Sequence, residues 1–329
     1  MATLGDRLGE ASLQAGAAAL RGLERYILSS SLVPTTPFLD PALLPWTAVV
    51  ERRWPEIRAE LDEVLHYRDE LPNFQDISVD QATITDDDRW KTFFFYGFGF
   101  KSEANCARCP RTTSALELIP GMTTAFFSIL SAHKHIEAHR GPYRGVMRYH
   151  LGLRVPEPAD AAGISVGGQV AHWAEGSSLL FDDGYEHYAW NDTDGIRAVL
   201  FVDVVRPLRR PAADVNRAVL RAVSVSPFVR DAKRRHAAWE EGFARRRDRS
   251  VPAAPEAARV GCVGPCAARL PATRSGPPAG IPARPGPRRP PPSADRGRGR
   301  PSPPAPSAPQ RIPRTPPRSG GHRRRRRSR

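Results

Sequence analysis

The chain has 329 residues, 34 prolines, 4 cysteines and a formal net charge of +14. Residues 251–329 hold 20 of the prolines and a charge of +16, from 18 arginines and 2 acidic residues, with no Phe, Tyr or Trp. That composition excludes a packed core there and predicts a disordered Pro/Arg-rich tail at 251–329, while no run of about 18 apolar residues exists to predict a membrane span.

The N-terminal segment, residues 1–35, is predicted to be an amphipathic helix. Apolar residues recur at helical spacing from Leu4 to Leu28, and we expect them to pack on the domain rather than on a membrane surface. The sequence does not open with a charged start followed by an apolar stretch, so we predict no signal peptide. Residues 34 to 45 form a proline-rich connector, and Trp54 to Tyr67 is predicted as a second helix because Pro55 suits its first turn.

Two segments precede the predicted barrel. The aromatic run from Trp90 to Phe100 is typical of a strand, which we expect to pack under the barrel. Cys106 and Cys109 have the spacing of half a zinc site, but a structural zinc needs four ligands and the two other cysteines lie in the tail. We therefore favour a reduced loop that caps a helix from Thr112 to Leu118.

The segment from residue 120 to 206 places polar side chains where a buried sheet should be apolar. Met122 to Leu130 is predicted as the first barrel strand. Along 146–153, Arg148 and His150 share one face while the other face is apolar, and along 197–204 Arg197 shares a face with Asp203. Because a buried charge needs a partner, we predict a jelly roll or small barrel whose interior binds an anionic ligand.

Histidines gather around these strands. His133, His135 and His139 precede the Arg148 strand, and we expect the first two to flank the approach to His139 on the same alternating face. His187 lies in a later strand. A lone strand histidine is more often a packed or surface group than a ligand, so the spacing alone neither predicts nor excludes a metal site.

The motifs as a set resemble the aspartyl/asparaginyl β-hydroxylase family over roughly residues 38 to 235. This resemblance implies a double-stranded β-helix (jelly roll, cupin-like), mainly β with flanking helices, at residues 36–250 with its core at about 120–206. The family belongs to the iron(II)- and 2-oxoglutarate-dependent dioxygenases, and its bacterial members include lipid A hydroxylase-like proteins. The matching motifs are His139-Arg-Gly-Pro142, Arg148-Tyr-His150-Leu-Gly-Leu153, Trp173-Ala-Glu-Gly176, Phe181-Asp-Asp183, Glu186-His187, Trp190-Asn191, Arg197 and Val202-Asp-Val204.

The resemblance also implies roles for individual residues. His139 and His187 would hold Fe(II), although the carboxylate that most relatives place two residues after the first histidine is here Gly141. The 2-oxoglutarate contacts implied by the match are Ser128, Arg148, His150 and Arg197. For Asp182 and Asp183 two readings stay open: a hydrogen bond to a metal-bound water, or capping of the turn before Gly184.

The implied activity is hydroxylation of an unactivated C–H bond with O2, releasing succinate and CO2. The substrate is expected to be a peptidyl Asp or Asn or a small molecule, with a lipid acyl chain as the alternative. The missing membrane span favours a cytoplasmic protein, with peripheral attachment to an inner membrane as the other option.

Two further hypotheses compete with this activity. One is a jelly-roll binder without turnover, which would not need both histidines and both arginines. The other is polyanion binding by the tail, whose arginines would bind RNA or acidic lipid non-specifically. The tail composition equally resembles a GC-rich gene translated in a shifted frame.

Overall fold

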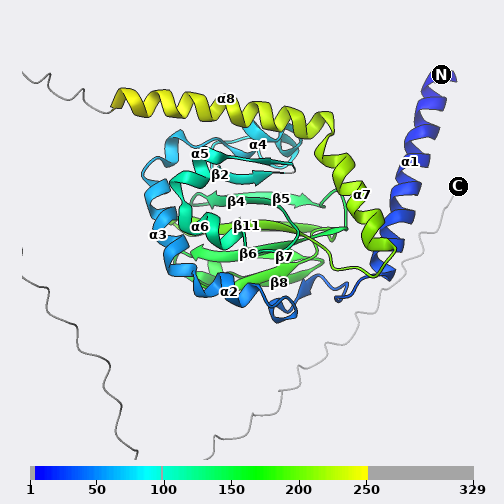
Figure 1. The fold of residues 1–329 in the computed structure, drawn as a ribbon, viewed down its shortest axis with the longest axis horizontal. Coiled ribbons are helices and arrows are strands. Elements are labelled where there is room, and N and C mark those ends of the chain that lie inside the picture. Colours follow the sequence, from blue (N-terminus) through cyan, green and yellow to red (C-terminus); the bar gives the residue numbers. More distant parts are fainter. Residues whose placement is uncertain (1–3, 98, 251–329) are drawn as a thin grey trace, which may run out of the picture. The chain divides into compact units, whose positions relative to one another are not determined.

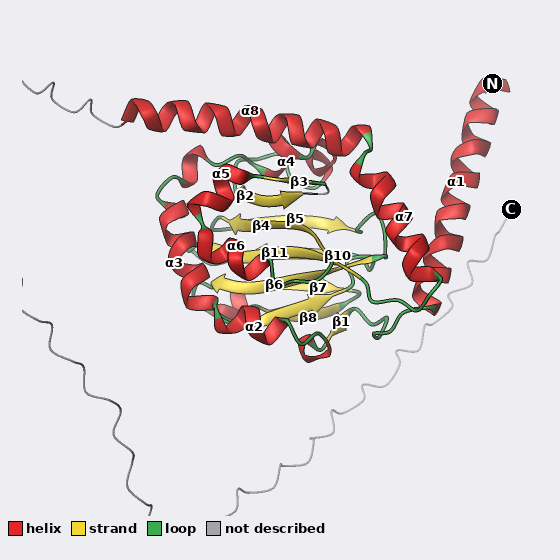
Figure 2. Cartoon of the chain, viewed as in Figure 1, coloured by secondary structure: helices red, strands yellow, loops and turns green. Residues whose placement is uncertain are grey.

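The computed structural model describes residues 4–97 and 99–250, and within them two antiparallel sheets face each other (Figures 1 and 2). The larger sheet has the order β1-β9-β6-β11-β4-β2-β3 and the smaller β5-β10-β7-β8. This is the predicted jelly roll, mainly β with flanking helices. The predicted tail at 251–329 lies outside the described residues. The strands are β1 (Phe38–Leu39), β2 (Trp90–Gly97), β3 (Phe100–Lys101), β4 (Met122–Leu130), β5 (Lys134–His139), β6 (Val146–Arg154), β7 (Ala162–Val166), β8 (Gln169–His172), β9 (Ser178–Phe181), β10 (His187–Asn191) and β11 (Arg197–Val205).

The helices are concentrated before β4 and after β11. The helix predicted at the N-terminus is α1, and the one predicted from Trp54 is α3, whose apolar side packs on β6. The helices are α1 (Leu4–Ser29), α2 (Thr47–Arg52), α3 (Trp54–Leu65), α4 (Phe74–Ile77), α5 (Glu103–Arg108), α6 (Pro110–Leu116), α7 (Ala212–Ser224) and α8 (Pro227–Ser250), with short 3-10 turns at Pro41–Leu43, Arg68–Glu70, Val79–Thr83 and Ala159–Ala161.

The faces of the central strands divide as the alternation predicts. On β6, Met147 and Tyr149 join the core beneath the helices, whereas Arg148 and His150 point between the sheets. On β11, Leu200 faces the helices, whereas Phe201 joins the core between the sheets. The space between the sheets therefore contains aromatic side chains together with the charged and imidazole groups that the strand alternation predicted there.

The aromatic run after Trp90 was expected under the barrel, and this expectation is wrong. Strand β2 pairs directly with β4, from Trp90 opposite Leu130 to Tyr96 opposite Ala125, so it is a strand of the larger sheet itself. Its alternating aromatics serve both cores: Phe93 faces the helices and Phe94 the space between the sheets. Apart from Lys91 and Thr92 this strand is mostly aromatic on both faces, so sequence periodicity does not reveal its place in the sheet.

The cysteines form a packed loop. Cys106 lies in α5 and Cys109 is the residue before α6, and both are buried as free thiols. Burial raises the pKa of both thiols, which keeps them protonated. The described residues contain no group of three or more metal-binding side chains, and none of their helices is long and apolar enough to cross a membrane.

Candidate active site

Two imidazoles meet where the ends of β5 and β10 pair. His139 lies directly opposite His187, with ring centroids 4.2 Å apart. Each Nδ1 is hydrogen-bonded to the backbone carbonyl two residues earlier, Glu137 O at 2.7 Å and Tyr185 O at 2.9 Å. An Nδ1–H that donates to a carbonyl leaves Nε2 with its lone pair free, which is the tautomer that binds metals.

The imidazoles are held in their neutral form. Burial lowers the pKa of His139, and burial with the nearby Arg148 charge lowers the pKa of His187 to about 3. Nε2 of His187 is buried and has no hydrogen-bond partner. A buried unpaired ring nitrogen costs free energy unless something binds it, so the pair fits a metal ion shared between the two rings.

A β-bulge turns His139 inward. Ala189 pairs with Ile136 while His187 pairs with His139, so the β5 strand contains an extra residue between the two pairs. The expectation that His133 and His135 share the face of His139 is therefore wrong. Both are exposed and bonded to acidic side chains, His133 to Asp194 at 3.0 Å and His135 to Asp192 at 2.6 Å.

The carboxylate of Asp183 lies where a side chain at position 141 would be. A Cβ on Gly141 would overlap the Asp183 carboxylate, and the Gly141 N–H donates to the Asp183 carbonyl at 2.8 Å. Asp183 is buried and ion-paired with Arg148 at 2.9 Å, while its Oδ1 has no partner. Burial raises the pKa of this carboxyl despite the arginine.

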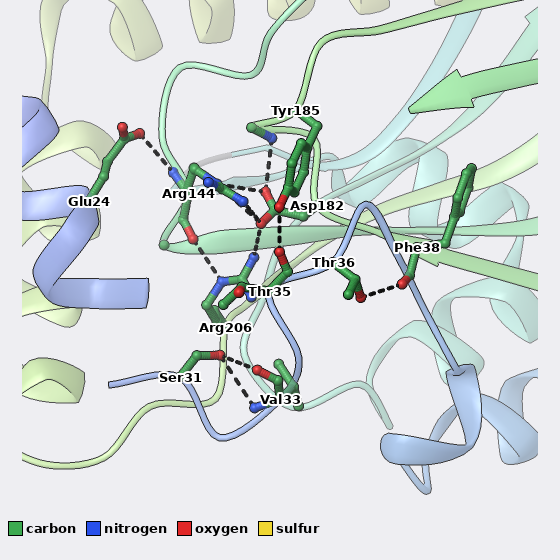
Figure 3. A network of polar contacts seen from close by, with 12 residues as sticks. Glu24, Ser31, Val33, Thr35, Thr36, Phe38, Arg144, Asp182, Tyr185 and Arg206 are labelled. Atoms are coloured by element: carbon green, nitrogen blue, oxygen red, sulfur yellow. Dashed lines mark hydrogen bonds and ion pairs between the residues drawn. The ribbon is translucent and has the colours of Figure 1, made fainter. Parts of the chain in front are cut away.

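Of the two neighbouring aspartates, Asp182 is the one that caps the turn. Its Oδ1 accepts the Gly184 N–H at 3.0 Å, and Figure 3 shows Arg144 and Arg206 both directed at its carboxylate, with ion pairs of 2.6 and 2.7 Å. Tyr185 lies beside Arg144 in the same network. This network fixes the loop that leads into His187, and the role of Asp183 beside the metal stays a prediction.

Arg148 and Asp203 are cross-strand partners on β6 and β11. Arg148 Nε donates to Asp203 at 2.9 Å, and its other end pairs with Asp183. Burial works against the charge of Arg148, but the two carboxylates outweigh it and raise its pKa. Arg148 therefore holds the loop before His187 in place. Its predicted contact with the co-substrate would use the guanidinium N–H groups that the two carboxylates leave free.

Arg197 is the opposite case. It is 2% exposed, its guanidinium group forms no ion pair or hydrogen bond with the described residues, and its Nε and one terminal nitrogen are fully buried. Burial alone lowers its pKa to about 9. Its guanidinium carbon lies 4.4 Å from the ring centre of Trp173. A charge of this kind needs an anion, and a planar fork suits a carboxylate.

Ser128 and His150 complete the predicted set. Ser128 lies on β4 near the register pair of Leu130 and Arg197, and its hydroxyl accepts a hydrogen bond from Trp90 at 3.0 Å, which leaves its own proton free to donate. His150 is buried with both ring nitrogens unpaired. Burial and the charge of Arg197 lower its pKa well below the ordinary value.

Trp173 contacts two of the predicted site residues but was not itself predicted as one. Its ring carries Arg197 on one side and lies 6.1 Å from the His150 ring, nearly parallel to it. Its indole N–H is buried without a partner. The only signal in the sequence was its position in the Trp-Ala-Glu-Gly motif, where function and packing give the same pattern.

The predicted residues therefore face one space between the two sheets. The imidazole pair lies on the smaller sheet, whereas Ser128, Arg148, His150 and Arg197 lie on the larger one. Unpaired donors and acceptors collect in this space, and the apolar side chains around them are largely aromatic. The set suits a metal ion at the imidazoles and a small acid at Arg197.

Comparison with known proteins identifies relatives of this chain. A family profile described as aspartyl/asparaginyl beta-hydroxylase matches residues 51–207. The chain is 55% identical over 207 residues to an ornithine lipid ester-linked acyl 2-hydroxylase from Rhizobium tropici, covering 63% of this chain and 74% of that protein. It is 28% identical over 196 residues to the aspartyl/asparaginyl beta-hydroxylase of Homo sapiens, covering 57% of this chain but 25% of that protein. A solved prolyl hydroxylase from Trichoplax adhaerens overlaps 53% of this chain and 83% of its own, with a TM-score of 0.38 and 14% identity.

Proposed function

Because the chain belongs to the aspartyl/asparaginyl β-hydroxylase family, we propose that it is a hydroxylase dependent on Fe(II) and 2-oxoglutarate. The observation that carries this proposal is Arg197, a buried cation without an acidic partner among the described residues, which faces the same space between the sheets as two neutral imidazoles. A site for an uncharged ligand would leave that desolvated charge uncompensated. A jelly-roll binder without a metal would not need the imidazole pair.

We assign the roles as follows. His139 and His187 hold Fe(II) through Nε2, and their Nδ1 bonds to the backbone fix the ring orientation. The fork of Arg197 binds the distal carboxylate of 2-oxoglutarate, and Ser128 donates its hydroxyl to the same group. When bound, the metal and co-substrate supply the O2 chemistry that hydroxylates a C–H bond and releases succinate and CO2.

The other residues position these groups and exclude water. His150 and Arg148 would contact the co-substrate, His150 through a neutral ring nitrogen. Phe126, Phe181 and Phe201 belong to the core between the sheets and keep the surroundings apolar, which strengthens each polar contact there. Asp182 holds the loop before His187 at a fixed place.

For the substrate we propose the acyl chain of an aminoacyl lipid, hydroxylated next to its ester carbonyl. The support is the 55% identity to a protein named for hydroxylation of the ester-linked acyl chain of ornithine lipid. This reverses the preference drawn from sequence alone, which was a peptidyl Asp or Asn or a small molecule. The peptidyl substrate stays the second candidate because the human relative bears that name at 28% identity.

The test is succinate release by the full chain with Fe(II), 2-oxoglutarate and O2. Ornithine lipid, a lipid A precursor and Asp-containing peptides are compared, and the product is examined for the mass of one added oxygen. Ornithine lipid should give stoichiometric succinate and a hydroxylated product, and H187A should give neither. Succinate coupled only to the peptides would overturn the lipid assignment, and no coupled succinate with any substrate would favour the non-catalytic binder.

The tail enters this test as a control. Residues 251–329 lie outside the described residues, so their predicted polyanion binding is examined by deletion. If turnover depends on the site between the sheets, a chain ending at residue 250 keeps its rate on detergent-dispersed lipid. If the polyanion hypothesis is right, that deletion abolishes function.

A further inference from the structure

Four lysine and arginine side chains in the described residues are at least nine-tenths buried: Lys91, Lys134, Arg197 and Arg206. Lys134 pairs with Asp87 at 3.1 Å and Arg206 with Asp182 at 2.7 Å. Arg197 belongs to the site already described. Lys91 is 9% exposed, and its ammonium group forms no ion pair or hydrogen bond with any described residue and is not one of the fully buried polar atoms. The stem of Lys91 is therefore buried while its unpaired ammonium group reaches the surface, where it is open to a ligand.

Lys91 does not face the space between the sheets. Along β2, Trp90 and Phe94 point between the sheets, and Lys91 pairs with Ile129, whose side chain joins the core beneath the helices. The lysine therefore emerges on the opposite face of the sheet from Ser128. Whatever compensates its charge is distinct from the co-substrate of Arg197.

A pocket of about 630 Å³ opens over Lys91 at the ends of the strands. Its cations besides Lys91 are Arg68, Arg89 and Arg154. Arg68 donates to the Ser131 hydroxyl at 2.6 Å, and its Nε is buried without a partner. Lys91 and Arg68, the least exposed of these four cations, thus present unused donors, one from an ammonium group and one from a planar fork, whereas Arg89 is ion-paired with Asp87 at 2.8 Å.

The acidic side chains of this pocket lie at its rim. Asp69, Asp88 and Asp194 are exposed, and Asp194 is already bonded to His133. A rim of carboxylates repels an extended polyanion such as nucleic acid. A small anion that passes the rim meets the positive interior instead.

We propose that this pocket binds a phosphate monoester, with Lys91 and Arg68 as its principal contacts and Ser131 as a hydroxyl donor. A dianion matches two or three converging cations better than a single carboxylate does. Ser131 follows Leu130, the register partner of Arg197, and Ile196 precedes Arg197. The phosphate site thus lies at the end of the strands that carry the co-substrate residues, on a separate surface.

The test is calorimetric binding to the full chain, with inorganic phosphate, methyl phosphate and phosphatidic acid vesicles as probes. Lys91→Met is compared with Arg52→Met, which removes an exposed cation on α2 and leaves the pocket intact. The arginine-rich tail is present in every variant, so its contribution cancels. Lys91→Met and Arg68→Gln should each weaken phosphate binding at least tenfold, whereas Arg52→Met should leave it unchanged.

Thermal unfolding gives a second readout that also shows whether the variant folds. Without phosphate, Lys91→Met should unfold at about the same temperature as the wild type, because methionine keeps the buried stem and the lysine ammonium group has no ion pair to lose. With phosphate, the unfolding temperature should rise only for the wild type and Arg52→Met. Equal phosphate binding and an equal rise in unfolding temperature in all variants would overturn the site. Binding of the soluble probes without vesicle binding identifies a soluble phosphate ester, and vesicle binding that depends on Lys91 identifies a lipid headgroup.

Discussion

Gly141 and Asp183 share one space: the carboxylate of Asp183 lies where any side chain at residue 141 would have to be. The Asp183 side chain cannot move aside freely, since it is buried and paired with Arg148. We therefore predict that Gly141→Ala lowers the free energy of unfolding by about 1–3 kcal/mol, as overpacking of a filled site does. Because Asp183 and Arg148 adjoin His187, metal affinity should fall as well. Chemical unfolding and Fe(II) titration measure the two effects.

Gly22→Ala is the control for this substitution. Gly22 lies in α1 with no atom near its added Cβ, so alanine should be neutral or stabilise by about 0.5–1 kcal/mol. Gly141→Ala behaving like Gly22→Ala would contradict the shared-space interpretation.

Replacing Arg197 should separate folding from ligand binding. Arg197→Met removes a buried charge that no described residue pairs, so the protein without ligand should be at least as stable as the wild type. With Mn(II) and 2-oxoglutarate at 100 times its dissociation constant, the wild type should gain about 2.7 kcal/mol. The variant should gain almost nothing from 2-oxoglutarate. Thermal unfolding with and without the co-substrate measures both.

A loss of stability in Arg197→Met without ligand would show that the arginine is a packing element. Arg148→Met provides the contrast. It leaves the carboxylates of Asp183 and Asp203 without their partner, and it should destabilise the protein by about 3–5 kcal/mol whether or not the co-substrate is present.

The sequence predicts which face of a regular strand each residue occupies, because the side-chain period is two. Arg148, His150, Arg197 and Ser128 all point between the sheets as that rule requires. The rule fails where the backbone adds a residue. The bulge between Ile136 and His139 shifts the parity, so His135 points outward although it stands at an even spacing from His139.

Pairing between distant strands is the second limit of the sequence. Two arginines and two aspartates, Arg148, Arg197, Asp183 and Asp203, are buried or largely buried at the site, and only their placement in the fold decides which charges neutralise each other. Asp203 lies opposite Arg148 and pairs with it. Arg197 therefore has no acidic partner among the described residues and can bind a ligand. Trp173 shows the same limit, since its contact with Arg197 depends on the turn between β8 and β9 and on no local pattern.

Trp173 should tune co-substrate affinity through the ring beneath Arg197. A cation–π contact contributes about 0.5–2 kcal/mol, so Trp173→Leu should raise the KM for 2-oxoglutarate about 2- to 30-fold. The effect on kcat should be smaller, because the indole contacts neither imidazole of the metal pair. Steady-state succinate release at varied 2-oxoglutarate measures the two constants.

Trp173→Phe keeps an aromatic face and should give an intermediate KM. The unfolding temperature of both variants identifies any general loss of packing. A fall in kcat with an unchanged KM would assign Trp173 to some other part of the reaction.

The pH dependence of stability can be tested away from the metal site, at His236 on α8. This imidazole is buried among Phe94, Phe100 and Trp239, and its Nε2 has no partner. Burial lowers its pKa, although Glu240 acts in the opposite direction. A folded-state pKa below the unfolded value means that the unfolded chain binds the proton more readily. The stability is therefore complete above about pH 6.5 and is lost as the pH falls below it.

His236→Phe should remove this dependence. It keeps the aromatic packing and cannot take up a proton, so it should match or exceed the wild type at pH 7.5. Below pH 6.5 the wild type should lose up to about 1.4 kcal/mol more per pH unit than the variant. Urea unfolding at pH 7.5, 6.5 and 5.5 measures the difference, with the exposed His66→Gln as control. Parallel pH profiles for wild type and His236→Phe would mean that His236 is not held neutral in the fold.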